Sequence, residues 1–327
     1  MKIAIIGLGV IGKIHADVLS MLGTPAGALC DIDDGRIQQA KSRFSPDAVG
    51  YHDWKQMLDE YHPDCIHVCT PHDLHAEMII EALKRDVHVL CEKPLCISEE
   101  EIDAVLKAEQ ASKAKLGVCH QNRYNTINLF LKDYLADKKI VGAYGSVAWH
   151  RDEEYYQSGN WRGNKKTAGG GVIINQALHT LDLLIWLCGE SHSVVAMDGN
   201  LTLKNVIEVE DTISLRCFGE VDYFLTATVG APAVFPVELS FKLENGDHIL
   251  ALPKTVLLNG EVIATEENIS ALGKDCYGRG HVSLVKDFYE CIAQDKPFSL
   301  NGAEGAKVIR TILKAYESQG EKLSLEQ

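Results

Sequence analysis

Residues 2–19 read KIAIIGLGVIGKIHADVL, an apolar strand followed by a glycine-rich turn and an amphipathic helix. The turn, Gly7-Leu8-Gly9-Val10-Ile11-Gly12, fits the GxGxxG pattern in the strand–turn–helix context that dinucleotide binding requires. In this pattern the first glycine allows the tight bend, the second lets the backbone approach a pyrophosphate, and the third lets the helix pack on the strand. The alternative is an ordinary glycine-rich turn. We expect a nicotinamide dinucleotide to contact Gly7, Gly9, Val10, Ile11 and Gly12.

The residue after the second predicted strand, 27–30, indicates which dinucleotide binds. Asp31 stands there, and a carboxylate in this position can accept hydrogen bonds from both ribose hydroxyls. The acidic run through Asp34 would repel a 2′-phosphate, so the sequence favours NAD, while Arg36 keeps NADP possible. For Asp33 and Asp34 we favour a simpler role, capping the next helix.

The chain of 327 residues changes its pattern near residue 120. Up to that point, short apolar strands alternate with amphipathic helices, which predicts a doubly wound parallel sheet of the Rossmann type over residues 1–120. Beyond it, a glycine-rich loop at 169–171 opens one apolar helix through Leu187. Alternating runs between Ser193 and Leu258 follow, with Asn-Gly turns, and two helices end the chain. Residues 121–327 are therefore predicted to form an α+β domain with an open, mostly antiparallel sheet, for substrate binding and oligomerisation.

Composition and charge exclude several classes of protein. The net charge of −14 disfavours nucleic acid and anionic membranes as partners. There is no leader-like start and no long apolar window, and the ten scattered cysteines suit a reducing compartment, so we expect a cytoplasmic protein. An open sheet with one uncovered face needs burial, which predicts a homodimer or homotetramer. Cys65, His67 and Cys69 share one face of a strand, but no second pair of ligands has a suitable spacing, so no metal is expected.

Two strand ends in the first domain carry candidate functional residues. Thr70-Pro71-His72 follows the strand at 65–69 and should lie beside the cofactor, because ligands bind at the carboxyl ends of parallel strands. His75 joins this set, although for it we favour a local hydrogen bond at the helix start. The strand at 87–91 ends in Cys91-Glu92-Lys93-Pro94, and Lys93 there could contact the cofactor and pass on the proton of a substrate hydroxyl.

The second domain contains further candidate residues for proton transfer and substrate binding. On one continuous helix after the glycines, Asn175 and His179 would be i,i+4 neighbours on the same face, and Asp182 could orient the imidazole. His179 could then accept the proton of the hydroxyl whose carbon loses hydride, with Asn175 holding a substrate hydroxyl. The loop before the glycines contains aromatic and amide side chains that suit a sugar or, equally, an interface, namely Tyr155, Tyr156, Asn160, Trp161 and Arg162.

These residues together resemble the Gfo/Idh/MocA family of oxidoreductases, which includes inositol and glucose–fructose type enzymes. The resemblance covers nearly the whole chain. Its marks are the Gly7–Gly12 turn, Asp31, Thr70-Pro71-His72-Asp73-Leu74-His75, Glu92-Lys93-Pro94, Gln121-Asn122-Arg123-Tyr124, Trp161-Arg162-Gly163, the 169–182 stretch, and Gly280-His281 ahead of Asp287-Phe288.

The resemblance implies a Rossmann domain, a second domain with an open sheet, and oxidation or reduction of polyols, sugars or sugar derivatives. It implies that Lys93 and His179 are catalytic, and it adds Asn122 and Arg123 to the candidate substrate-binding residues and Glu92 to the cofactor-binding ones. Many members carry Asp where Asn175 stands and Asn where His72 stands. A glycoside-cleaving enzyme that uses NAD transiently and a non-catalytic NAD-bound regulator are the alternatives, and the presence of both Lys93 and His179 opposes the regulator.

Overall fold

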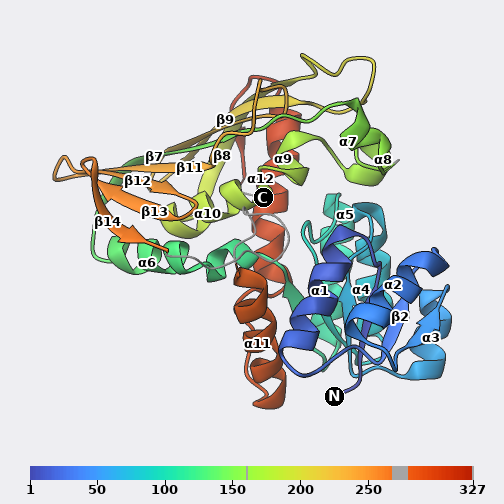
Figure 1. Ribbon diagram of the computed structural model, residues 1–327. Coiled ribbons are helices and arrows are strands. Elements are labelled where there is room, and N and C mark those ends of the chain that lie inside the picture. The colour runs from blue at the N-terminus through green and yellow to red at the C-terminus, as the bar shows by residue number, and fades with distance from the viewer. Residues whose placement is uncertain (160, 267–278, 326–327) are drawn as a thin grey trace. The chain divides into compact units, whose positions relative to one another are not determined.

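The computed structural model describes residues 1–159, 161–266 and 279–325 (Figure 1). The described residues divide into two compact units. The first unit comprises 1–121 and 279–306, and the second comprises 122–266 and 307–325. A segment near the C-terminus therefore packs with the first unit, whereas the sequence predicted a single boundary at residue 120.

The first unit is built on a six-stranded parallel sheet with the strand order β3-β2-β1-β4-β5-β6. Its strands are three or four residues long: β1 Ile3–Ile6, β2 Ala28–Cys30, β3 Val49–Tyr51, β4 Cys65–Val68, β5 His88–Cys91 and β6 Leu116–Val118. The order reverses between β1 and β4, which is where ligands bind in doubly wound sheets. The predicted Rossmann fold is confirmed.

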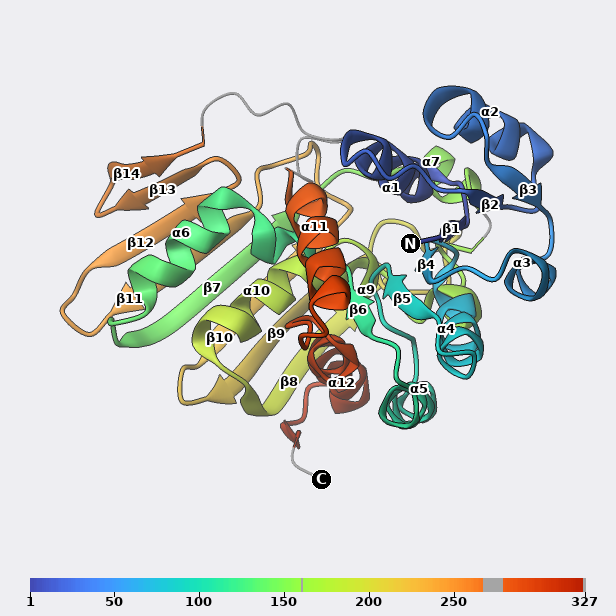
Figure 2. The same cartoon turned by 90° about the horizontal axis from the view of Figure 1, so that it is seen from below.

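Helices cover both faces of this sheet, as the near-continuous burial of its strands requires. They are α1 Val10–Met21, α2 Asp34–Phe44, α3 Trp54–Tyr61, α4 His75–Leu83, α5 Glu99–Ala111 and α11 Gly280–Ala293. Figure 2 shows α1 and α2 on one side of the sheet and α4 and α5 on the other. Strand β3 and helix α3 were not predicted from the sequence; both are short and partly exposed.

The second unit is built on a nine-stranded sheet with the order β14-β13-β12-β11-β7-β10-β9-β8-β15. All neighbouring pairs are antiparallel except β7 and β10, which are parallel. The strands are β7 Ile140–Ala148, β8 Ser191–Gly199, β9 Thr212–Gly219, β10 Tyr223–Thr228, β11 Glu238–Leu243, β12 His248–Leu252, β13 Thr255–Leu258, β14 Glu261–Thr265 and β15 Leu323–Ser324. The expected mostly antiparallel sheet is confirmed, and the sequence analysis missed β14 and β15.

The helices of the second unit are α6 Thr126–Leu135, α7 Glu153–Gln157, α8 Lys165–Ala168, α9 Val172–Asn175, α10 Leu178–Cys188 and the part of α12 Gly302–Ser318 that begins at Lys307. Helix α10 packs on β7 and β10, where Thr180 and Leu184 approach Gly145.

The side chains of Tyr144 and Phe224, on neighbouring strands, are 38% and 44% exposed. Aromatic surface of the sheet is therefore accessible in this single chain.

The prediction of one continuous helix from residue 171 through Leu187 was wrong. The chain breaks between α9 and α10, and the pieces on the two sides of the break are inclined by 55°. At the break, the N–H groups of Gln176 and Ala177 both donate to the carbonyl oxygen of Val172, over 2.9 Å each. Asn175 ends the first piece and His179 lies in the second, so the expected i,i+4 relationship on one regular helix does not hold.

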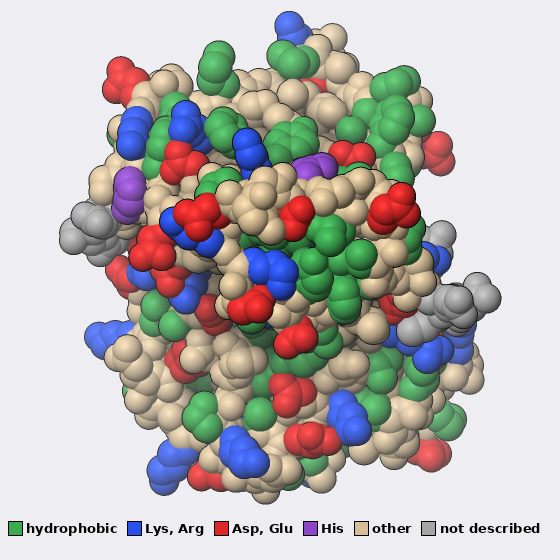
Figure 3. All heavy atoms as spheres, turned by 90° about the vertical axis from the view of Figure 1, so that its left-hand side faces the viewer, with side chains coloured by type: hydrophobic (Ala, Val, Ile, Leu, Met, Phe, Trp, Pro, Cys, Tyr) green, Lys and Arg blue, Asp and Glu red, His purple; other side chains and the backbone are tan. Residues whose placement is uncertain are grey.

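Nine of the ten cysteines lie in described residues; all nine are free and eight are buried, while Cys276 lies outside the described residues. Within the described part of the chain, no single helix is long and apolar enough to cross a bilayer. One bent pair of helical segments, Lys165–Asn175 and Leu178–Cys188, reaches that length and apolar character only when the two are taken together. Figure 3 shows acidic, basic and apolar side chains interspersed over one face.

Candidate active site

The glycine-rich turn has the close contacts that its sequence predicts. The N–H of Gly7 donates to the Cys30 carbonyl oxygen over 2.8 Å, which ties the turn to the end of β2. A Cβ at Gly12 would overlap the carbonyl oxygen of Gly7, so no larger residue fits at this helix–strand contact. A Cβ at Gly9 would meet nothing within 4 Å, so the backbone there is open to a ligand at the N-terminus of α1.

Asp31 is fixed at the end of β2 by backbone donors. Its Oδ2 accepts the N–H of Leu8 over 2.6 Å and its Oδ1 accepts the N–H of Asp33 over 2.9 Å, and the residue is only 7% exposed. Each carboxylate oxygen retains acceptor capacity for a ribose hydroxyl. The Nη1 atom of Arg36 lies 3.7 Å from Oδ1 on a side chain that is 49% exposed.

Two neighbours of Asp31 have separate roles. The Asp33 side chain accepts the N–H of Arg36, so Asp33 is the N-cap of α2, as predicted, and Asp34 is the first residue of that helix. Ile32, the residue after the buried Asp31, is 90% exposed. The sequence analysis did not single it out; it could cover the face of an adenine ring.

The turn after β4 is held by contacts between a buried histidine and backbone carbonyl groups. His72 is buried, and it belongs to a short 3-10 helix, His72–Leu74. His75 is wholly buried, with its Nδ1 2.7 Å from the Pro94 carbonyl oxygen and its Nε2 3.0 Å from the Thr70 carbonyl oxygen. Both ring nitrogens of His75 therefore have backbone partners, which supports the local role and links this turn to the one that carries Lys93.

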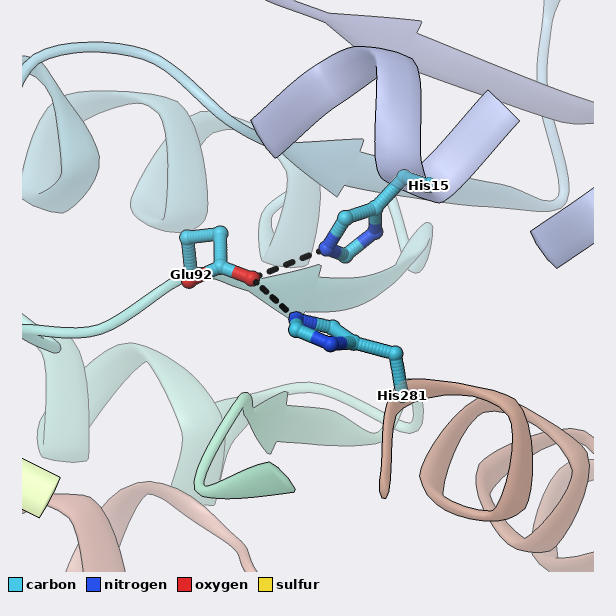
Figure 4. Close-up of side chains that lie close together, drawn as sticks. All are labelled: His15, Glu92 and His281. Carbon is cyan, nitrogen blue, oxygen red and sulfur yellow. Dashed lines mark hydrogen bonds and ion pairs between the residues drawn. The ribbon is translucent and has the colours of Figure 1, made fainter. Parts of the chain in front are cut away.

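Glu92, at the end of β5, is the centre of a buried polar cluster (Figure 4). Its Oε1 lies 2.9 Å from the Nε2 of His15 in α1 and 3.3 Å from the Nε2 of His281 in α11. Its Oε2 accepts the backbone N–H of Lys93 over 3.3 Å. Burial alone would raise the pKa of Glu92, but the hydrogen bonds from His15 and His281 outweigh it and hold that pKa well below its usual value.

The cluster extends away from Glu92 along a chain of hydrogen bonds. The Nδ1 of His15 lies 2.7 Å from the Nδ1 of His67, and the Nε2 of His67 lies 2.7 Å from the hydroxyl oxygen of Tyr289. Burial lowers the pKa of His67 and raises that of Tyr289, so the imidazole is neutral and the phenol keeps its proton. Because both nitrogens of His67 are occupied, the strand face of Cys65, His67 and Cys69 offers no ready imidazole ligand.

The ligand atoms of His15, Glu92 and His281 all lie within 4.8 Å of one another. That spacing is compatible with a shared metal ion as well as with direct hydrogen bonds. The 2.9 Å separation between His15 and Glu92 is an ordinary hydrogen-bond length.

In the second unit, Glu210 organises the glycine-rich loop. Its Oε2 accepts the N–H of Gly171 over 2.8 Å, and its Oε1 accepts the N–H of Ile173 over 3.1 Å and the hydroxyl of Tyr316 over 3.0 Å. A Cβ at Gly171 would overlap the Glu210 carbonyl oxygen, so the close approach requires glycine. Burial raises the pKa of Glu210 to about 7, against the opposing effect of these hydrogen bonds. The sequence analysis missed Glu210, which lies 39 residues from Gly171.

Asp182 forms a bidentate ion pair with Arg123. Its two oxygens accept from Nε and Nη2 of the guanidinium over 2.9 Å and 2.6 Å, and both residues are buried. Arg123 therefore anchors η2, Gln121–Tyr124, to α10. The expected orientation of His179 by Asp182 and the substrate contact of Arg123 both stay predictions. In the same turn, the Asn122 carbonyl oxygen accepts from the Asn128 side chain over 2.7 Å.

Aromatic and amide side chains gather beside the glycine-rich loop. The Gln176 amide nitrogen lies 3.3 Å from the Tyr155 hydroxyl, and the Arg162 guanidinium lies over the rings of Tyr155 and Trp161. Tyr156 is 5% exposed; among the described residues, neither its hydroxyl nor the Oε1 atom of Gln176 has a hydrogen-bond partner. Such buried polar atoms are candidates for ligand contacts. Asn160 lies outside the described residues.

An open pocket of about 490 Å³ lies against the glycine-rich loop, lined by residues that include Lys165, Gly170, Asp198, Glu210 and Tyr316. Its volume is within the usual range for small-molecule sites.

The structure places Gly7–Gly12, Asp31, the Thr70 turn and Lys93 in the first unit. It places the predicted substrate residues in the second unit, together with His179, which is half-buried in α10.

Comparison with known proteins agrees with this architecture. Residues 1–120 match the model described as oxidoreductase family, NAD-binding Rossmann fold, and residues 135–234 match the GFO/IDH/MocA C-terminal domain. Myo-inositol 2-dehydrogenase of Thermotoga maritima is 23% identical over 335 residues, covering 99% of this chain and 98% of that protein. Levoglucosan dehydrogenase of Pseudarthrobacter phenanthrenivorans is 28% identical over 211 residues, covering 60% of this chain and 53% of that protein.

A solved structure shares the fold from end to end. The WlbA dehydrogenase from Chromobacterium violaceum, in complex with NADH and UDP-GlcNAcA, is 27% identical with a TM-score of 0.85, covering 99% of this chain and 95% of that one. Its similarity includes both sheets, and the two matched family models cover most of the sequence. The chain therefore belongs to the Gfo/Idh/MocA family of oxidoreductases, with an NAD-binding Rossmann domain at its N-terminus.

Proposed function

We propose that this protein is an NAD-dependent dehydrogenase that transfers hydride between NAD and a CH–OH carbon of a polyol, a sugar or a sugar derivative. The observation that carries the proposal is the built cofactor turn, in which an open Gly9 and a carboxylate fixed at Asp31 coincide with a family match over the same residues. The relatives named myo-inositol 2-dehydrogenase and levoglucosan dehydrogenase support the substrate class.

The first unit supplies the cofactor contacts. The N-terminus of α1 and the open backbone at Gly9 suit a pyrophosphate, Asp31 suits the ribose hydroxyls, and exposed Ile32 suits the adenine ring. The turns at Thr70 and Lys93 follow β4 and β5 at the same edge of the sheet, where the nicotinamide ring would lie. NAD supplies the hydride acceptor when it is bound there.

Lys93 and His179 supply the proton chemistry in this proposal. His179 acts as the general base that takes the proton from the substrate hydroxyl, and Lys93 acts as a hydrogen-bond donor to the substrate, which favours formation of the carbonyl. Asn175, Tyr156 and Gln176 offer hydrogen bonds to the other hydroxyls of the substrate. The unpartnered hydroxyl of Tyr156 and Oε1 of Gln176 support this part of the proposal.

The deciding experiment is a screen of the purified protein with NAD for NADH formation. The panel should contain myo-inositol and other cyclic polyols, aldoses, anhydrosugars, uronic acids and nucleotide-linked sugars. We expect steady NADH production with at least one class. Cleavage of a glycoside without net NADH would instead establish the redox-assisted lyase, and NAD binding with no reaction on any class would establish the regulator.

A further inference from the structure

Glu92 uses both of its carboxylate oxygens inside the first unit. Oε1 accepts hydrogen bonds from His15 and His281, which lie on helices at opposite ends of the sequence. Oε2 accepts the backbone N–H of Lys93. Figure 4 shows the two imidazoles converging on the carboxylate from α1 and α11. Glu92 is 4% exposed, and both histidines are at most 1% exposed. The carboxylate thus connects two core helices to the peptide group of the proposed catalytic lysine.

Every proton in the cluster can be assigned with neutral imidazoles. Tyr289 donates to the Nε2 of His67, the Nδ1–H of His67 donates to the Nδ1 of His15, and the Nε2–H of His15 donates to Glu92. The Nε2–H of His281 donates to the same carboxylate. All donors point toward the single carboxylate, and hydrogen bonds in such a chain polarise one another. A buried carboxylate is costly unless its oxygens are hydrogen-bonded, and here three donors meet that need.

We infer that Glu92 is a positioning residue for Lys93 rather than a cofactor contact. Its carboxylate, held by His15 and His281, fixes the backbone of the turn from which the Lys93 side chain extends. On the other side of this turn, His75 contacts the carbonyl oxygen of Pro94. The turn is therefore braced before and after Lys93, and this role of Lys93 rests on the proposed function above.

The physical consequence is precision in the placement of the lysine. Removing the carboxylate leaves the Lys93 N–H without this acceptor and leaves two buried imidazoles facing a void. A displacement of about 1 Å in a catalytic group can lower a rate by about 10²-fold. Glutamine at position 92 can preserve the contacts, because its oxygen can accept the Lys93 N–H while its amide group donates to both imidazoles in their other tautomer.

Hydrogen exchange at the Lys93 amide tests the inference without any substrate. Pro94, the next residue, has no amide hydrogen, so the exchange of the Lys93 amide can be distinguished from that of its neighbour. In the NAD-saturated protein, we expect E92A to exchange this amide about tenfold faster than the wild type, and E92Q to stay close to the wild type. H88Q is the matched control, because His88 lies on the same strand, β5, but outside this cluster, where it accepts the N–H of Lys115, and its replacement should leave the Lys93 amide unchanged.

Kinetics with a substrate from the screen supply the second measurement. E92A should lower kcat by about 10²-fold with KM and the Kd of NAD nearly unchanged, and E92Q should restore most of the rate. If E92A does not fold, H281Q replaces it, with a smaller change in the same direction in both measurements. Absence of hydride transfer in the wild type would contradict the proposed function, while the exchange data would still decide the inference.

Three results would overturn the inference. Unchanged Lys93 exchange in a folded E92A protein would show that the carboxylate does not hold this turn. A loss of NAD affinity of tenfold or more, with normal exchange, would make Glu92 a cofactor contact. Stoichiometric zinc or another divalent metal in the purified protein, lost in H15Q and H281Q, would mean that the three side chains coordinate an ion instead.

Discussion

The hydroxyl of Tyr316 donates a hydrogen bond to the carboxylate of Glu210 over 3.0 Å. The same carboxylate accepts the backbone N–H groups of Gly171 and Ile173, so it connects α12 to the loop that begins α9. The conformation of the chain that leads to Asn175 and His179 therefore depends on a buried acidic group whose pKa lies near neutrality.

The first prediction is a pH-dependent stability that originates at Glu210. Burial raises its pKa from 4.5 to about 7 in the folded protein, so the folded state keeps this proton to higher pH than the unfolded chain does. The free energy of unfolding should therefore fall as pH rises from about 4.5 to 7, by up to about 3 kcal/mol, and change little from this source above 7. Thermal melts across this range measure it.

The variant E210Q should remove most of this slope, because its side chain does not titrate. E220Q is the control: Glu220 is an exposed carboxylate in the same unit, and its replacement should leave the slope unchanged. Equal slopes in the wild type and E210Q would show that Glu210 is ionised throughout this range, held so by its three donors.

The second prediction concerns the buried pair of Arg123 and Asp182. Removing one partner leaves an uncompensated buried charge, so R123A and D182A should each lower the free energy of unfolding by about 3–5 kcal/mol. The double variant R123M/D182L should recover part of that loss, because it removes both charges. Chemical denaturation of the four proteins gives the comparison. Near-normal stability of R123A with a raised KM would instead support the original expectation that Arg123 binds substrate.

The sequence predicted the fold well because its strong signals are local. Strand β1 is an unbroken apolar run, β4 and β5 are apolar except for one histidine each, and the Gly7–Gly12 turn is decided by a contact between residues five positions apart. Strands β12 and β13 lie within the predicted alternating runs, and an Asn-Gly turn precedes β12 and another follows β13. Elements with weak or partly exposed patterns, such as β3 and β14, were missed.

The site was predicted only in part because its supporting contacts are long-range. Glu92 and His281 are separated by 189 residues, and nothing in the periodicity of either segment indicates that they meet. The break after Asn175 also has no local signal, because residues 172–187 contain neither glycine nor proline. Residue types at strand ends indicated which groups carry the chemistry, whereas their supports required the three-dimensional structure.

The third prediction concerns cofactor choice. Asp31 presents a fixed carboxylate, so NAD should bind more tightly than NADP, and D31A should weaken NAD by about 1.5–3 kcal/mol for each ribose hydrogen bond lost. Because Asp31 also accepts the N–H of Leu8, part of the loss will come from the glycine-rich turn. D34N, which removes a neighbouring exposed charge, is the control. Fluorescence titrations that show tighter binding of NADP to the wild type would contradict the assignment.

The fourth prediction concerns assembly through the sheet of the second unit. Phe224 and Tyr144 are paired across β10 and β7, and both expose aromatic surface. We predict a homodimer or homotetramer that buries this surface, and F224D should shift it toward monomers because a carboxylate there would lose its hydration on association. M21D, at an exposed methionine of the first unit, should not. A monomeric wild type in light scattering at micromolar concentration would refute the prediction.

The last prediction separates the roles of His179 and Asn175. If His179 is the proton acceptor, H179A should lower the rate of single-turnover hydride transfer by about 10²–10⁴-fold while the Kd of NAD barely changes. The exposed His192 of the same unit gives the control variant H192A, which should transfer hydride at the normal rate. Because the helix breaks between Asn175 and His179, regular i,i+4 geometry does not couple them, and N175A should mainly raise KM. A fall in the chemical step of N175A would show that the amide orients His179 despite the break, and a full chemical rate in H179A would exclude this histidine as the base.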